Sequence, residues 1–196
     1  MSRGQETREE ILMQAFKAAS MLGLDGLSIG TLAKQVGMSK SGLFAHFRSK
    51  ENLQLEVLQW ITEMFTQDVI VPALKVPRGE PRLRALLENW MNWHESKKVP
   101  GGCVIISAAS EFDDQPGHVK DFLQASHTRL VETLARVFRG GIEEGHFRAD
   151  IDPEQFAFEL YSLILGFHHY TRLLGDPNAK DRLKAAYERK ILSAKA

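Results

Sequence analysis

The residues best suited to chemistry in this sequence are the polar and basic side chains between Ser28 and Lys50. This stretch contains four lysine or arginine residues and no aspartate or glutamate. Residues 1–50 hold seven basic and four acidic residues and so carry +3, whereas the remainder carries −3. Positive charge gathered in one segment of a neutral chain is typical of a surface that meets phosphate groups. Phosphate binding is therefore the first chemistry that the sequence indicates.

A second candidate for chemistry is Cys103, the only cysteine in the sequence. An activated thiol can serve as a nucleophile or a redox sensor, so a helical enzyme or redox sensor built on Cys103 is one alternative function. Nothing in the neighbouring sequence visibly activates it, and a lone cysteine is more often a small buried hydrophobic residue. We therefore predict no enzymatic activity. A single cysteine also excludes an intramolecular disulfide, which fits a reducing compartment.

Histidines could join Cys103 in a metal site, and the candidates are His94, His127, His168 and His169. Their spacings lack a compact ligand motif, so we predict neither a metal ion nor another cofactor. The simpler interpretation places one of His168 and His169 toward a pocket or an interface and the other toward solvent.

Helical periodicity runs through the whole sequence, which predicts an all-α fold of about nine helices without strands or repeats. Thr7 and Glu10 form a capping-box pattern at the start of the first helix. A long helix that follows Ser49 should end before Pro72. The N-terminus lacks a signal-peptide pattern, and no apolar run approaches the roughly 18–20 residues that span a bilayer. We therefore expect a cytoplasmic protein.

The basic segment divides into two short helices joined by a glycine-containing turn. Ser28 can cap the first helix, Gly37 can end it, and Ser39 can cap the second. Leu43 and Phe47, one helical turn apart, would anchor the second helix to the core. This is the layout of a helix-turn-helix, whose second helix lies in the major groove of DNA. Gly42, on the opposite face, would allow a close approach to the duplex.

Residues 7–53 resemble the DNA-binding domain of the TetR family of transcriptional regulators. The resemblance rests on Leu27-Ser28, Leu32-Ala33, Val36-Gly37-Met38-Ser39, Gly42-Leu43-Phe44-Ala45-His46-Phe47, Ser49-Lys50-Glu51 and Leu53. The length of the chain and the helix count match the family as well. The resemblance implies a helix-turn-helix DNA-binding domain at residues 1–52 and a helical effector-binding and dimerisation domain at residues 53–196.

The function that the resemblance implies is a ligand-responsive regulator, usually a repressor, that binds a near-palindromic operator as a homodimer. A small-molecule effector would release it from double-stranded DNA, and the aromatic residues of the C-terminal helices suggest that this effector is apolar or aromatic. A nonspecific DNA-binding protein that senses nothing is a further alternative.

The residues expected at the DNA are Ser28, Thr31, Ser39, Lys40, Ser41, Gly42, Phe44, His46 and Lys50. By resemblance, Ser28, Phe44, His46 and Lys50 fall on phosphate-contacting positions, whereas Lys40, Ser41 and Gly42 fall where the family approaches base edges. Two positions depart from the family pattern. Phe44 stands where a tyrosine is usual and lacks its hydroxyl, and Gly30 stands where an arginine is common.

The C-terminal helices carry weaker signals. The segments Pro100-Gly101-Gly102-Cys103 and Glu111-Phe112-Asp113-Asp114 are similar to one branch of the family. Candidate effector-pocket residues are Trp60, Met64, Trp90, Trp93, Cys103, Ile106, Phe122, His127 and Phe167, although the aromatic ones could simply fill the core. The helix from Phe156 to Leu174 is apolar nearly all round, which suggests that a second subunit covers it. The expected interface residues are Phe156, Leu163, Gly166, Tyr170, Leu183, Tyr187 and Ile191.

Overall fold

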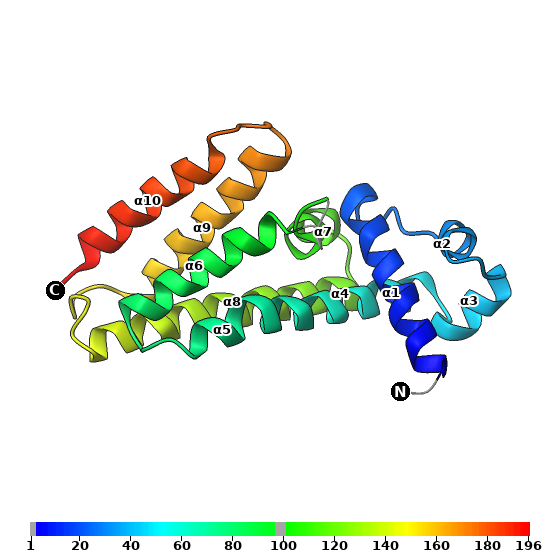
Figure 1. The fold of residues 1–196 in the computed structure, drawn as a ribbon, viewed down its shortest axis with the longest axis horizontal. Helices are drawn as coiled ribbons and strands as arrows, with labels where there is room; N and C mark the ends of the chain where they lie inside the picture. Colours follow the sequence, from blue (N-terminus) through cyan, green and yellow to red (C-terminus); the bar gives the residue numbers. More distant parts are fainter. Residues whose placement is uncertain (1–2, 97–100) are drawn as a thin grey trace. The chain divides into compact units, whose positions relative to one another are not determined.

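The structure is a computed structural model, and it describes residues 3–96 and 101–196. Figure 1 labels the α-helices, which are α1 (Arg3–Leu22), α2 (Ile29–Gln35), α3 (Lys40–Phe47), α4 (Lys50–Phe65), α5 (Val71–Leu74), α6 (Glu80–His94), α7 (Val104–Phe112), α8 (His118–Glu143), α9 (Pro153–Arg172) and α10 (Ala179–Ala194). The π-helical turn η1 (Thr66–Ile70) connects α4 to α5. Because α4, η1 and α5 follow one another without a break, the described residues form nine helices in all. The all-α prediction is confirmed, since the described β-structure is one isolated bridge between Phe147 and Lys195.

The chain forms two compact units. The first comprises Met1–Phe65 with His94–Ala125, and the second comprises Thr66–Trp93 with Ser126–Ala196. These units do not test the predicted boundary at residue 52, which stays a prediction.

The core of the first unit joins the apolar faces of α1, α2, α3 and α4. The buried side chains include Ile11, Phe16, Leu32, Leu43, Phe47, Leu53, Val57 and Ile61. Each lies on the apolar stripe of its helix, which is the pattern expected when helices pack around one core. This packing fixes the orientation of α3 relative to α1 and α2.

The second unit is built around α6, α8, α9 and α10. Its centre holds three stacked rings: Phe138 lies 3.8 Å from Phe156 and 4.7 Å from Phe147, measured between ring centroids. The π-helical turn η1 precedes Pro72, which has no N–H to continue a regular helix. The amide of Asn89 donates to the Val69 carbonyl oxygen at 3.1 Å, so α6 satisfies a backbone acceptor at this irregular turn.

None of the described helices combines the length and the apolar character that a membrane crossing requires.

Candidate nucleic-acid interface

Local backbone chemistry defines the two helices of the candidate site. Ser28 caps α2 by accepting the Thr31 N–H at 3.4 Å, and Ser39 caps α3 by accepting the Gly42 N–H at 3.1 Å. Both serines have extended backbones, as N-cap residues do. The expected N-caps of both helices are therefore present.

The turn between α2 and α3 depends on Gly37, whose φ of +67° lies in the left-handed region. The Met38 N–H donates to the Ala33 carbonyl at 2.9 Å, and the Gly37 N–H donates to the Lys34 carbonyl at 3.4 Å. This pair of bonds is a Schellman motif, which closes the end of a helix and redirects the chain. A side chain at position 37 would be strained by the backbone conformation alone.

Helix α3 presents one face to the core and the other to solvent. Leu43 and Phe47 are fully buried, whereas Phe44 is 51% exposed. Lys40 and Ser41 are exposed too, and His46 is half-buried. The structure therefore leaves the predicted DNA-facing side chains of this helix accessible to a ligand.

Gly42 has a structural role beside the predicted close approach to DNA. A Cβ at this position would lie 3.1 Å from the Ser39 Oγ that caps the helix. The same Ser39 Oγ lies 3.2 Å from Ser41 Oγ. Ser39 is thus engaged within the protein, while Ser41 carries an exposed hydroxyl at the start of α3.

Gly30 stands in open space. A Cβ there would meet only Ser28 Oγ, at 3.8 Å, and the backbone is not left-handed. Nothing in the fold requires glycine at this position, so the departure from the family pattern is not imposed by packing.

Lys50, the first residue of α4, has a partner that the sequence did not reveal. Its Nζ donates to the carbonyl oxygen of Asp25 at 2.5 Å and to Asp25 Oδ1 at 2.8 Å. The Lys50 side chain remains 45% exposed. Nothing in the sequence around Asp25 and Gly26 indicates that this segment reaches the start of α4.

The expected effector-pocket residues divide between the two units. In the first unit, Cys103 is buried, and Trp60, Met64, Ile106 and Phe122 are half-buried. In the second unit, Trp90, Trp93 and Phe167 are buried, and His127 is half-buried.

The second unit gathers an aromatic cluster that includes one residue missing from the prediction. Tyr161 Oη lies 2.5 Å from His127 Nδ1, and its ring centroid lies 6.3 Å from that of Trp90. Tyr161 lies on α9 between Phe156 and Leu163, which the sequence assigned to the interface, and nothing in the local sequence sets it apart as a pocket residue. Among the described residues, no three His, Cys, Asp or Glu side chains are grouped in a way that could hold a metal ion.

The expected dimer residues require a correction. Phe156, Leu183, Tyr187 and Ile191 are buried within the subunit itself, each 4% exposed or less, so they offer almost no surface to a second subunit. Burial also raises the pKa of the Tyr187 hydroxyl well above its usual value. The apolar character of these residues serves the packing of α9 and α10 against their own chain.

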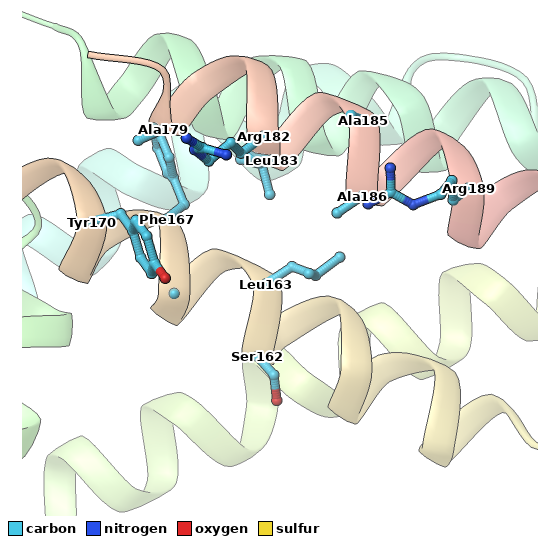
Figure 2. A pocket seen from close by; sticks show the side chains of 11 residues that line it. Ser162, Leu163, Phe167, Tyr170, Ala179, Arg182, Leu183, Ala185, Ala186 and Arg189 are labelled. Carbon is cyan, nitrogen blue, oxygen red and sulfur yellow. The ribbon is translucent and has the colours of Figure 1, made fainter. Parts of the chain in front are cut away.

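The other expected dimer residues lie along a groove. Leu163, Gly166 and Tyr170 of α9 line a cavity of about 700 Å³ together with residues of α10, among them the largely buried Leu183. In Figure 2, Leu163 and Ser162 on α9 lie across this groove from Ala186 and Arg189 on α10. Exposed apolar side chains on these two helices are Phe158, Leu165, Tyr170 and Leu192, and Leu173 and Leu174 follow directly after α9.

Comparison with known proteins identifies the family of this chain. Residues 11–57 match the family model for bacterial regulatory proteins of the tetR family. Residues 79–187 match the model for the tetracyclin repressor-like C-terminal domain. The chain belongs to the TetR family. It is therefore a transcriptional regulator of this family, and α2 and α3 are its helix-turn-helix.

Individual relatives are distant in sequence but similar in structure. The HTH-type transcriptional repressor NemR of Escherichia coli K12 is 22% identical over 163 residues, which are 82% of this chain and 81% of NemR. A TetR transcriptional regulator from Chloroflexus aurantiacus is 26% identical, with a TM-score of 0.86 over 98% of this chain and 96% of the other. AibR, solved with isovaleryl coenzyme A and operator DNA, is 20% identical, with a TM-score of 0.74 over 92% and 95% of the two chains.

Proposed function

We propose that this TetR-family regulator is a ligand-responsive repressor that binds a near-palindromic operator as a homodimer. The observation that carries the proposal is the exposed polar face of α3, held opposite the buried anchors Leu43 and Phe47. A short helix fixed in this way, with no acidic residue between Ser28 and Lys50, suits the negatively charged major groove.

The residues of the site divide by the DNA group that they would contact. Ser28 and Thr31 lie at the start of α2, His46 lies near the end of α3 and Lys50 begins α4, and polar groups at such positions can meet phosphates. Lys40 and Ser41, with Gly42, begin α3, which is the end of a recognition helix that approaches base edges. Phe44 keeps an exposed ring but has no hydroxyl to donate to a phosphate. Gly30 has no side chain that could read a base, so base reading would depend more on Lys40 and Ser41 of α3.

A homodimer is proposed because the second unit exposes an apolar face. Phe158 is 64% exposed and Leu173 is 72% exposed, and Leu165 is exposed between them. Their spacing of seven and eight residues places them along one side of α9 and its C-cap, Leu173. Contiguous exposed apolar side chains indicate a protein interface. With Leu163, Gly166, Tyr170 and Leu192, they form the proposed contact with a second copy of the chain.

The proposed effector is a small apolar or aromatic molecule. Trp90 and Tyr161 offer aromatic surface, and the His127–Tyr161 hydrogen bond provides a polar group that could orient a ligand. AibR was solved with isovaleryl coenzyme A and operator DNA, which supports a ligand-responsive role for a protein of this architecture. We propose no enzymatic role, since Cys103 is buried.

The test is selection of bound duplexes from a randomised DNA library with the full-length protein. We expect an enriched palindrome whose half-site centres are about 34–36 Å apart or a multiple of that. Binding without any enriched sequence would instead identify a nonspecific DNA-binding protein. A thermal-shift screen of small apolar compounds, followed by displacement of the selected duplex, would then test the response to an effector. The enzymatic alternative is tested by screening the wild-type protein and Cys103→Ala in parallel for hydrolase and thiol-exchange activity. An activity that the wild type has and the variant lacks would support this alternative.

A further inference from the structure

A carboxylate of α7 holds the turn between α1 and α2. Glu111 Oε2 accepts the backbone N–H of Asp25 at 2.7 Å, across 86 positions of the sequence. Glu111 lies outside residues 11–57, which match the DNA-binding family model. The helix-turn-helix domain therefore receives support from a helix that its own sequence does not contain.

Gly23 makes room for this carboxylate. Its φ of +83° is in the left-handed region, and a Cβ there would lie 2.9 Å from Glu111 Oε1. Glycine thus meets two requirements at once, namely the backbone conformation that ends α1 and the close approach of Glu111.

The segment before α7 contacts the same end of α1. The Gly101 N–H donates to Ser20 Oγ at 3.3 Å, and a Cβ on Gly101 would lie only 1.5 Å from the Ser20 carbonyl oxygen. No side chain other than hydrogen fits at position 101 with this backbone. Residues 101–112 are therefore docked on α1 and the turn that follows it at two separate points.

Helix α4 holds the turn from a second direction. The buried Gln54 amide donates to the Leu24 carbonyl at 3.1 Å. Lys50 donates to both the carbonyl and the carboxylate of Asp25. Asp25 is consequently bonded on both sides, with its N–H to Glu111 and its oxygens to Lys50.

We propose that Glu111 is a positioning residue for operator binding, which fixes the α1–α2 turn and through Asp25 the Lys50 ammonium. The inference rests on the proposed function, because Lys50 is there assigned to a phosphate. An ammonium group has three N–H donors, and two are directed to Asp25, which leaves one for the operator. Without Glu111 the α1–α2 turn loses one of its hydrogen bonds, and the Lys50 side chain is held less firmly before DNA binds. Binding must then also supply the conformational entropy of ordering Lys50, which lowers the affinity for the operator.

The test is a double-mutant cycle on the full-length protein and its selected operator, with Kd measured by fluorescence anisotropy. Glu111→Met removes the acceptor at similar size, and Glu111→Gln keeps a neutral, weaker acceptor. Each is measured with Lys50 intact and in a Lys50→Met background. We expect Kd to rise about 3–10-fold for Glu111→Met and about 2–3-fold for Glu111→Gln, because charged acceptors form the stronger hydrogen bonds. In the Lys50→Met background both losses should vanish.

Glu111→Met also removes a negative charge, which by itself would favour DNA binding, so a loss of affinity runs against the simple electrostatic effect. Asp114→Asn removes an exposed charge just beyond α7 and serves as the matched control, with no loss expected. Equal losses with and without Lys50 would overturn the inference, because they would indicate a general structural role for Glu111. Should Glu111→Met not fold, the Glu111→Gln arm of the cycle decides the question alone. A wild-type protein that selects no operator would instead contradict the proposed function.

Discussion

The guanidinium carbon of Arg8 lies 5.2 Å from the centre of the Phe47 ring. Its Nη2 lies 2.5 Å from Glu56 Oε2, and its Nη1 donates to the His46 carbonyl at 3.3 Å. One side chain of α1 therefore contacts α4 and the C-terminal end of α3 together. These contacts add to the buried anchors Leu43 and Phe47 in holding α3, which is only eight residues long.

Arg8→Met keeps the aliphatic stem but removes the cation–π contact and both hydrogen-bonded interactions. We expect the free energy of unfolding to fall by about 1–2 kcal/mol, since each contact contributes modestly at a partly exposed site. Urea denaturation followed by circular dichroism measures this change. Lys17→Met, an exposed change on the same helix, should stay within about 0.5 kcal/mol of the wild type. Equal effects of the two substitutions would contradict the role given to Arg8.

Lys50→Met should weaken binding to every DNA sequence. Loss of one phosphate contact is expected to reduce the slope of log K against log salt concentration by about one. Binding titrations at several salt concentrations measure the slope. Lys75→Met removes an exposed lysine at the end of α5 and should leave the slope unchanged. An unaltered slope for Lys50→Met would show that its ammonium makes no phosphate contact and remains with Asp25.

Ser41→Ala should change sequence preference rather than overall affinity for DNA. Its hydroxyl is exposed at the start of α3, and the cap of the helix depends on Ser39 instead. We expect the penalty for a mismatch at one position of each half-site to fall by about 1–3 kcal/mol. Repeating the selection with Ser41→Ala, and with Ser110→Ala on α7 as a control, measures this. If both variants recover the wild-type operator, Ser41 does not read a base.

Two glycines of the helix-turn-helix should respond in opposite ways to substitution by alanine. Gly30 lies in α2 with open space around it, so Gly30→Ala should stabilise the protein by up to about 1 kcal/mol. Gly37 has a positive φ, so Gly37→Ala should destabilise it by about 1–2 kcal/mol. Thermal unfolding of the pair gives the comparison. A loss of stability from Gly30→Ala would mean that the position is more constrained than its surroundings indicate.

The contrast between these glycines shows what the sequence can predict here. Caps and helix ends follow from short-range chemistry, so Ser28, Gly37 and Ser39 were placed correctly from neighbouring residues. The prediction that Thr7 starts the first helix was wrong, because α1 begins at Arg3 and the capping-box pattern lies inside the helix. Pro72 did not end the long helix either, since the chain passes through a π-helical turn and continues to Leu74.

Contacts between residues far apart in the sequence could not be predicted from it. Glu111 and Asp25 stand 86 positions apart, and no local pattern connects a carboxylate at the end of one helix with a turn elsewhere. The prediction of interface residues on α9 and α10 meets a related difficulty, because some of these residues are buried within the subunit. The sequence of an apolar helix indicates that other residues cover it, but it does not indicate which face packs against the same chain and which against a partner. The sequence therefore assigned Phe156 and Ile191 to a partner, whereas the structure buries both in the core of the subunit.

The exposed face of α9 can be tested by placing charge on it. Phe158→Glu and Leu173→Glu should shift the protein from dimer to monomer in sedimentation equilibrium, because a buried, unpaired carboxylate opposes association. Each subunit should remain folded, since both side chains are largely exposed within it. Operator affinity should fall more than about 10-fold when the two DNA-binding domains are no longer linked. Leu74→Glu, an exposed change on α5, is the control and should leave the dimer intact. If the α9 variants stay dimeric with unchanged operator affinity, the second subunit binds elsewhere and this apolar face must be assigned to another partner.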